Sequence, residues 1–398
     1  MYVVLARALG VDEYGVFIYA FTWINVLLLV GRLGTDLSII RFLPVHVQAG
    51  DWPRARGILR VTHLAVGAAT VAVGFLSAAA VYSGMMAGGR YGTAFLLGLL
   101  SMPLLGLSML RQGALRSVRA FLLAEIPDGL IRPWLLVAAV GGGWLVAQDV
   151  SAGNAMLCYF AANIVTLVVG SVWLRRALPS QILAADSVFE VRHWLAVSAQ
   201  LMLQTGVFQL MNQVDVLMLG VLADPDDVAR YSAASRLSWF VSFGALAISS
   251  IAAPLIARHH SERNLGSLQS VVSSGTRKGF AFAALVSFAL CLLGPLVLAL
   301  FGQEFASAYP SLVVLVVAQL VNAFWGLGSY VMIMMDRQRQ LILITLAALL
   351  LTVALNALLI PQWEAIGAAS AKAVTIAVWS GGVFVYCWKA LRVRAWAL

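Results

Sequence analysis

Charged side chains fall within long apolar stretches of this sequence, where a charge is costly to bury. At the centre of a lipid bilayer such a charge costs about 2.5–3.5 kcal/mol on insertion scales, so it faces protein or water and usually serves a function. Clustered cations can receive an anion, and the planar Arg side chain suits a phosphate because it donates two parallel hydrogen bonds. The charged residues at or within these stretches are Arg7, Arg32, Asp36, Asp215, Arg230, Arg236 and Lys372.

Asp215, Arg236 and Lys372 lie at similar depths in three different stretches. Each is about 7–8 residues from the nearer end of its stretch, or roughly 11–12 Å along a helix. We expect a cationic cavity in which Arg236 and Lys372, together with Arg7 and Arg32, bind an anionic head group. Asp215 would pair with a cation when that cavity is empty, and it is also a candidate for ion coupling. A buried ion pair with an unrelated Lys is the structural alternative.

Arg32 and Asp36 are spaced i, i+4, which predicts a local salt bridge on one helix face. Asp36 is therefore a second candidate for ion pairing or coupling. Asp36 and Arg230 also lie near the ends of their stretches, where a charged side chain can reach the membrane interface.

Sequence signatures of catalysis are lacking. The chain has no Gly-x-Ser-x-Gly motif and no Walker P-loop, and its three cysteines, Cys158, Cys291 and Cys387, are far apart within apolar segments. Metal sites need closely spaced Cys and His ligands. The sequence therefore predicts no catalytic residue, no metal site and no cofactor.

The apolar stretches that carry these charges are long enough to cross a membrane. The chain is 62% hydrophobic and only 11% charged over 398 residues, and a stretch of about 20 apolar residues spans the hydrocarbon core as a helix. Alternation over about ten residues would indicate a membrane barrel instead. We predict an all-α integral membrane protein with spans at about 15–40, 61–83, 91–111, 131–148, 153–174, 194–222, 228–257, 279–301, 308–335, 341–360 and 364–388.

The loops between these spans alternate in charge. Twenty Lys and Arg residues fall in segments on one side of the membrane, and the opposite loops carry only Arg90 among acidic residues such as Asp12, Asp149 and Asp226. Because basic loops stay in the cytoplasm, this pattern predicts a multi-pass membrane protein with a cytoplasmic C-terminus. It also accounts for the net charge of +9 without a nucleic-acid partner. The basic segments are 41–60, 111–132, 175–192, 258–278, 337–339 and 389–394.

Weak self-similarity relates the two halves of the chain at an offset of about 210–214 residues. The acidic turn GVDEY, the following Tyr19 and Pro44 correspond to ADPDD, Tyr231 and Pro254. The opening MYVVLARALG then corresponds to the outer end of a span, so about twelve helices are expected with the first one incomplete. We predict an N-terminal lobe over 1–190 and a C-terminal lobe over 191–398, parallel six-helix bundles that bind cargo in a central cavity between them.

A series of short segments resembles the polysaccharide flippases of the multidrug/oligosaccharidyl-lipid/polysaccharide exporter superfamily. The resemblance covers essentially the whole chain. In order, the segments are LARALGVDEYGVFIYAF, SIIRFLP, GDWPRARGILR, QVDVLMLG, YSAASRL, APLIAR, LFGQEF and NALLIPQWEAIGAASA.

This resemblance implies a transporter with the fold of the multidrug and toxic compound extrusion (MATE) proteins. It implies movement of an undecaprenyl-pyrophosphate-linked oligosaccharide from the cytoplasmic to the outer leaflet of the bacterial inner membrane, for O-antigen, capsule or exopolysaccharide biosynthesis. The expected partners are this lipid-linked oligosaccharide, membrane lipids, a polysaccharide polymerase and export machinery. In such proteins spans one, two, seven and eight line the cavity, and here those spans carry Arg7, Arg32, Asp36, Asp215 and Arg236.

Two other functions compete with this interpretation. A cation-coupled multidrug extruder of the same superfamily would need an acidic cavity, whereas the charged residues within these spans are mostly basic. A membrane polysaccharide polymerase would need a large outside loop that holds a catalytic site, and the predicted outside loops are about 4–10 residues long. The longest cytoplasmic connections, near 111–132, 175–193 and 258–278, are predicted at about 20 residues.

Overall fold

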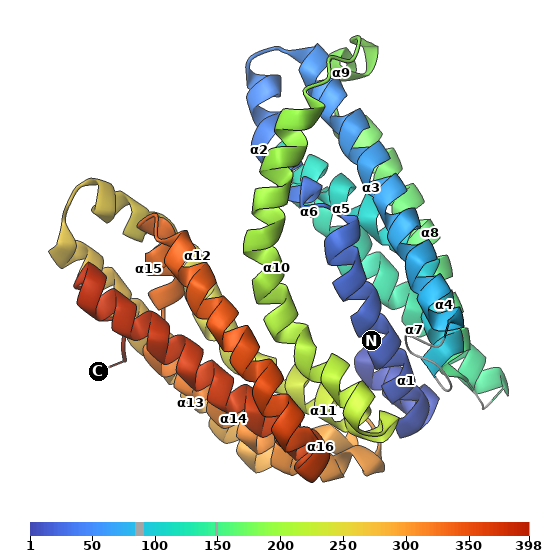
Figure 1. The fold of residues 1–398 in the computed structure, drawn as a ribbon, viewed down its shortest axis with the longest axis vertical. Coiled ribbons are helices and arrows are strands. Elements are labelled where there is room, and N and C mark those ends of the chain that lie inside the picture. The colour runs from blue at the N-terminus through green and yellow to red at the C-terminus, as the bar shows by residue number, and fades with distance from the viewer. Residues whose placement is uncertain (84–90, 148–149, 398) are drawn as a thin grey trace. The chain divides into compact units, whose positions relative to one another are not determined.

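The computed structural model describes residues 1–83, 91–147 and 150–397, and these residues form helices and connecting turns without a β-strand (Figure 1). Arg90 and Asp149, which the sequence placed in outside loops, lie outside the described residues. The packing of the chain separates two compact units, Met1–Gly206 and Val207–Leu398. The all-α membrane architecture predicted from composition is confirmed.

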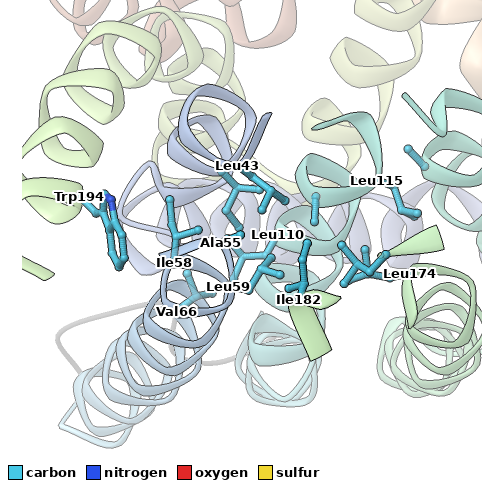
Figure 2. Close-up of a cluster of buried hydrophobic side chains, with 14 residues drawn as sticks. Leu43, Ala55, Ile58, Leu59, Val66, Leu110, Leu115, Leu174, Ile182 and Trp194 are labelled. Carbon is cyan, nitrogen blue, oxygen red and sulfur yellow. The ribbon is translucent and has the colours of Figure 1, made fainter. Parts of the chain in front are cut away.

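The first unit is built around α5, which packs against α2, α3 and α8. At the cytoplasm-facing end predicted from charge, buried side chains of these helices form one apolar cluster, in which Leu43, Ile58 and Leu110 meet (Figure 2). The elements of this unit are α1 (Tyr2–Gly31), α2 (Thr35–Gln48), α3 (Trp52–Tyr82), α4 (Gly92–Leu99), α5 (Met102–Ser117), α6 (Phe121–Ile126), the π-helix η2 (Pro127–Ile131), α7 (Arg132–Ala147), α8 (Ala152–Ala177), α9 (Ser180–Ala184) and the first half of α10 (Val191–Leu222).

The second unit is organised around α14, which packs against α11, α13 and α16. Its elements are the second half of α10, α11 (Pro225–Ser238), the 3-10 helix η3 (Trp239–Ser242), α12 (Phe243–Ser261), α13 (Leu265–Ala299), the 3-10 helix η4 (Gln303–Ala308), α14 (Tyr309–Trp325), α15 (Gly328–Met334) and α16 (Gln338–Leu391).

The 54-residue element α16 is two antiparallel helices joined at a sharp break. Glu364 has φ 49° and ψ −127°, which is not helical. Across this break Thr352 Oγ1 donates to Thr375 Oγ1 at 3.1 Å, and Trp379 Nε1 donates to Thr345 Oγ1 at 3.0 Å. Residues so far apart along one straight helix could not touch, and Figure 1 shows the orange-red and dark-red arms of α16 side by side.

The helices agree with the predicted spans. Within the described residues, nine helices are long and apolar enough to cross a membrane, or ten if the pair α4 and α5, bent by 44°, is one span. The count of ten treats α16 as one helix. Counting its two arms separately gives eleven, the number predicted from sequence. At the start of the chain, Gly10 has φ 73° and separates residues 2–9 from 11–31, where the sequence predicted the end of one span and the beginning of the next.

The predicted cytoplasmic connections are mostly helical, which corrects the sequence interpretation. The connection placed at 111–132 shrinks to Val118–Ala120, and the one at 258–278 shrinks to Glu262–Asn264. Hydropathy marks where a helix leaves the hydrocarbon, whereas backbone hydrogen bonds carry the helix on into the polar interface. The connection near 175–193 keeps its irregular backbone, apart from the short α9.

Helix boundaries recur along the chain at the predicted offset. The helices α3 and α13 begin 213 residues apart, at Trp52 and Leu265. The helices α8 and α16 end 214 residues apart, at Ala177 and Leu391. The lobe boundary near residue 190 stays a prediction.

Candidate functional site

Asp215 lies at the centre of a buried polar cluster in the second unit. Its side chain is almost fully buried, with 1% of the residue exposed. The carboxylate oxygen Oδ2 lies 2.9 Å from Lys372 Nζ and accepts a hydrogen bond from Tyr231 Oη at 3.2 Å. The other oxygen, Oδ1, accepts from Asn356 Nδ2 at 3.1 Å. A buried carboxylate needs such partners because desolvation alone would disfavour its charged form.

Lys372 is held by a second acceptor besides Asp215. Its Nζ donates to the main-chain oxygen of Met211 at 2.7 Å, one helical turn before Asp215 in α10. The ammonium is therefore enclosed by a carboxylate and a carbonyl, and its positive charge is neutralised within the protein. The structure thus pairs Asp215 with Lys372, and anion binding by Lys372 stays a prediction.

The four polar side chains of this cluster lie at similar distances from the nearest end or break of their helices. Asp215 is seven residues before the end of α10, and Tyr231 is six residues after the start of α11. Asn356 and Lys372 are each eight residues from the break at Glu364 in α16. At about 1.5 Å per residue, all four lie roughly 9–12 Å below these ends, as the sequence predicted for Asp215 and Lys372.

Arg236 lies on a different side of α11 from Tyr231. Arg236 follows Tyr231 by five residues in α11, which places it about 140° around the helix from that side chain. It is half-buried, whereas Arg7 in the first part of α1 is exposed. The expectation that Arg236, Lys372, Arg32 and Arg7 bind substrate remains a prediction.

Arg32 and Asp36 form the salt bridge that their spacing predicted, with 3.3 Å between Nη1 and Oδ2. They do not share one helix face, however, because α1 ends at Gly31 and α2 begins at Thr35. Gly34 lies in the break with φ 68°, and a Cβ there would collide with the main-chain oxygen of Ser198. The ion pair therefore bridges a break in the span predicted at 15–40.

The first unit contains a buried ionic network that the sequence analysis missed. Arg111 is 1% exposed and pairs with Asp128, which also lies 3.3 Å from Arg132. Arg132 Nη1 donates to Asn163 Oδ1 at 3.2 Å, and Arg111 Nη1 donates to the main-chain oxygen of Thr166 at 3.2 Å. The sequence interpretation assigned Arg111 and Arg132 to a cytoplasmic loop, but both lie within helices.

One sequence signal could have located this network, and a second feature of it is visible only in the structure. Asp128 follows Pro127 inside a mostly apolar stretch, one helical turn before Arg132. Gly170 in α8 leaves the space that Arg111 fills, because a Cβ at Gly170 would overlap the guanidinium. A buried Arg beside a glycine on a neighbouring helix is a pattern that only a three-dimensional arrangement makes visible.

A cavity of about 210 Å³ lies in the second unit next to the ion pair. Met211, whose oxygen accepts from Lys372, lines it, and so does Ile376, one turn after Lys372 in α16. Polar lining residues include Asn212, Gln319 and Asn322. Among the described residues, no group of three or more His, Cys, Asp or Glu side chains is placed to hold a metal ion.

Comparison with known proteins assigns the chain to a family. Residues 1–260 match the family model described as polysaccharide biosynthesis protein. The chain belongs to this family. A second model, MatE, matches residues 201–358, and no curated protein matches the chain.

Solved structures of transporters and flippases share the fold of this family member. A MATE family multidrug resistance transporter of the MOP superfamily, in an inward-facing conformation, matches with a TM-score of 0.77 and 16% identity, over 98% of this chain and 90% of that one. The lipid II flippase MurJ in an inward closed conformation matches with a TM-score of 0.78 and 13% identity, over 99% and 84%. A MOP superfamily transporter from Pyrococcus furiosus matches with a TM-score of 0.65 and 17% identity, over 96% and 87%.

These matches define the class of the protein. It is a multi-pass membrane protein of the polysaccharide biosynthesis family, and it shares its fold with a MATE family transporter and with the lipid II flippase MurJ. The resemblance seen in the sequence is confirmed.

Proposed function

We propose that this protein is a flippase that moves undecaprenyl-pyrophosphate-linked oligosaccharide units across the bacterial inner membrane for surface polysaccharide biosynthesis. The observation that carries this proposal is the match of residues 1–260 to the polysaccharide biosynthesis family. The fold shared with a lipid II flippase supports it, because that protein is named for a lipid-linked cargo. Transport would occur without covalent change to the cargo, in a membrane that also holds the polymerase and export machinery.

The proposed transport path lies between a lobe of residues 1–190 and a lobe of residues 191–398. Arg236, Arg32 and Arg7 would attract the pyrophosphate, because Arg donates paired hydrogen bonds to phosphate oxygens. Lys372 would contribute its charge when Asp215 is protonated or releases it. Asp215 and Asp36 are thus the candidates for coupling cargo movement to an ion gradient.

The role of these charged residues can be tested in a strain whose chromosomal copy of the gene is deleted and that carries the parent protein or a variant on a plasmid. We expect Arg236→Ala and Lys372→Ala to abolish surface polysaccharide. Membrane levels should stay normal for Arg236→Ala, whereas Lys372→Ala also leaves buried Asp215 without its partner, so its effect is read beside the double variant Asp215→Asn/Lys372→Met at a matched membrane level. Arg258→Ala is the matched control, because its side chain is 70% exposed at a helix end, where it pairs only with the neighbouring Glu262 among the described residues. Normal polysaccharide in both test variants would remove the cationic-path idea.

A multidrug extruder is the second candidate, and the MatE match over residues 201–358 favours it. Its cationic cargo would need acidic side chains in the path. The buried carboxylate of Asp215 in the second unit is a candidate for this role, but Lys372 already neutralises its charge. A deletion strain that keeps normal surface polysaccharide and becomes sensitive to cationic drugs would replace the flippase proposal with this one.

A further inference from the structure

The cavity of the second unit lies beside two interruptions of its α-helical backbone. The 3-10 helix η3 (Trp239–Ser242) interrupts α11 and α12, and Gly326, with φ 60°, separates α14 from α15. Residues at both breaks line the cavity, among them Trp239, Ser242 and Gly326. At membrane depth, irregular backbone is found where it is buried in protein or lines an aqueous cavity. Two breaks around one cavity therefore indicate a polar binding site.

The polar side chains of this cavity carry hydrogen-bonding groups that the protein leaves open. The side chains of Asn322, Ser329 and Tyr330 form no hydrogen bond with any other described residue. Ser242 Oγ lies 2.9 Å from Gln319 Oε1, which leaves the amide hydrogens of Gln319 available as donors. These amides and hydroxyls can each donate, and most can also accept.

The rest of the lining is aromatic and aliphatic, and no lining residue is charged. Phe208 and Trp379 face the cavity with their ring centroids 6.2 Å apart and an angle of 49° between the rings. The hydrogen bond from Trp379 Nε1 to Thr345 fixes the orientation of the indole. Aromatic rings offer a flat apolar surface with a negative face, to which the C–H bonds of a sugar ring can be apposed.

The volume fits one six-membered ring. A protein cavity of about 150 Å³ holds a benzene molecule, and this cavity measures about 210 Å³. A pyranose ring with its hydroxyls is larger than benzene and hydrogen-bonds in every direction around its rim. The combination of aromatic faces, amides and hydroxyls matches that pattern.

We infer that this cavity binds one neutral sugar ring of the transported oligosaccharide. The inference rests on the proposed flippase function and adds a subsite within the second unit to it. A phosphate or an acidic sugar would find no countercharge among the lining residues, and a drug cation would find no carboxylate. An acyl chain would leave the side chains of Asn322, Gln319 and Tyr330 without partners, which costs free energy for each buried group.

Saturation-transfer NMR with simple glycosides tests this inference on the full chain. The protein is placed in lipid nanodiscs free of glycoside detergent, and the probes are the methyl glycosides of glucose, galactose, mannose and N-acetylglucosamine. We expect at least one probe to receive saturation at millimolar concentration. Asn322→Leu should weaken its binding by about tenfold, the ratio that corresponds to about 1.4 kcal/mol.

Tyr330→Phe is the second test variant, because it removes one hydroxyl and leaves the fold unchanged; it should weaken binding by a few fold. The matched controls are Asn154→Leu, at an exposed position of α8 in the first unit, and Tyr386→Phe, which is not among the lining residues. Both controls should bind as the parent does.

Three results would overturn the inference: no glycoside binds, binding is unchanged in both test variants, or decanol binds in place of the sugars. These outcomes are separate from a failure of the proposed function. If a deletion strain still loses its surface polysaccharide while no glycoside binds, the flippase proposal stands and the sugar subsite is wrong.

Discussion

At the scale of single residues, Asp215 and Lys372 illustrate how a membrane protein tolerates buried charge. Each is expensive alone, and their separation of 2.9 Å lets each offset the cost of the other. Asn356 and Tyr231 complete the hydrogen bonding of the carboxylate. The sequence predicted that Asp215 pairs with a cation, and its structural alternative left Lys372 outside that pair, whereas the structure makes Lys372 the partner. Depth along the helices did not separate the two cations, because Arg236 and Lys372 lie at similar depths.

Removing one member of this pair should destabilise the protein more than removing both. We expect Asp215→Asn and Lys372→Met each to lower the free energy of unfolding by about 3–5 kcal/mol, because each leaves a buried charge without its partner. The double variant should recover most of that loss. Thermal unfolding of the purified variants in nanodiscs measures this, and a double variant less stable than both single variants would contradict the pairing.

The network of Arg111 leads to a second prediction at this scale. Gly170→Ala places a methyl group on the guanidinium of Arg111, so we expect a loss of about 1–3 kcal/mol from overpacking. Gly153→Ala in the same helix is the control, because its Cβ would meet only ordinary contacts at 3.6 Å or more. Equal melting temperatures for the two variants would show that Arg111 can move aside without cost.

At the scale of secondary-structure elements, breaks in the helices position the polar groups. The break between α1 and α2 brings Arg32 to Asp36, η3 and Gly326 border the cavity, and Glu364 folds α16 into two arms. Hydropathy predicted the two arms of α16 as separate spans. It did not predict the breaks inside other spans, because these depend on φ angles and close contacts rather than on the apolar content of a window.

Gly34 and Gly50 illustrate two different reasons why a position requires glycine, a positive φ angle and a lack of space for a Cβ. Both have φ 68°, but a Cβ would clash with the backbone of Ser198 and Met202 only at Gly34. We expect Gly50→Ala to cost about 1 kcal/mol from backbone strain alone, and Gly34→Ala to cost clearly more. Thermal unfolding of the two variants checks this, and similar losses would mean that α10 shifts freely away from residue 34.

At the scale of the whole molecule, helix boundaries repeat between the two halves of the chain, and basic segments alternate with acidic ones. Helix boundaries recur about 213 residues apart, at Trp52 and Leu265 among others. The alternation of basic and acidic loops sets the expected orientation, since basic residues resist translocation. The shortening of connections to three residues, as at Glu262–Asn264, does not change the order of basic and acidic segments along the chain on which this alternation rests.

The orientation can be measured with fusions to the full chain and to a truncated one. We expect a C-terminal green fluorescent protein to fluoresce and a C-terminal alkaline phosphatase to be inactive, because the C-terminus is predicted to be cytoplasmic. Fusions after Ala223, in the acidic turn between α10 and α11, should behave in the opposite way. A periplasmic C-terminus would reverse the whole assignment, including the side from which cargo enters.

The sequence by itself determined the class of the protein, the approximate positions of its spans and the distances of Asp215 and Lys372 from the ends of their helices. Those properties follow from the apolar content and helical rise of single segments, which neighbouring helices do not alter. Only the tertiary structure decided which charges meet: Lys372 rather than Arg236 beside Asp215, and Arg111 with Asp128 inside the first unit. The physical reason is that pairing depends on helix rotation and on space left by residues such as Gly170, and neither is encoded in the local pattern of one segment.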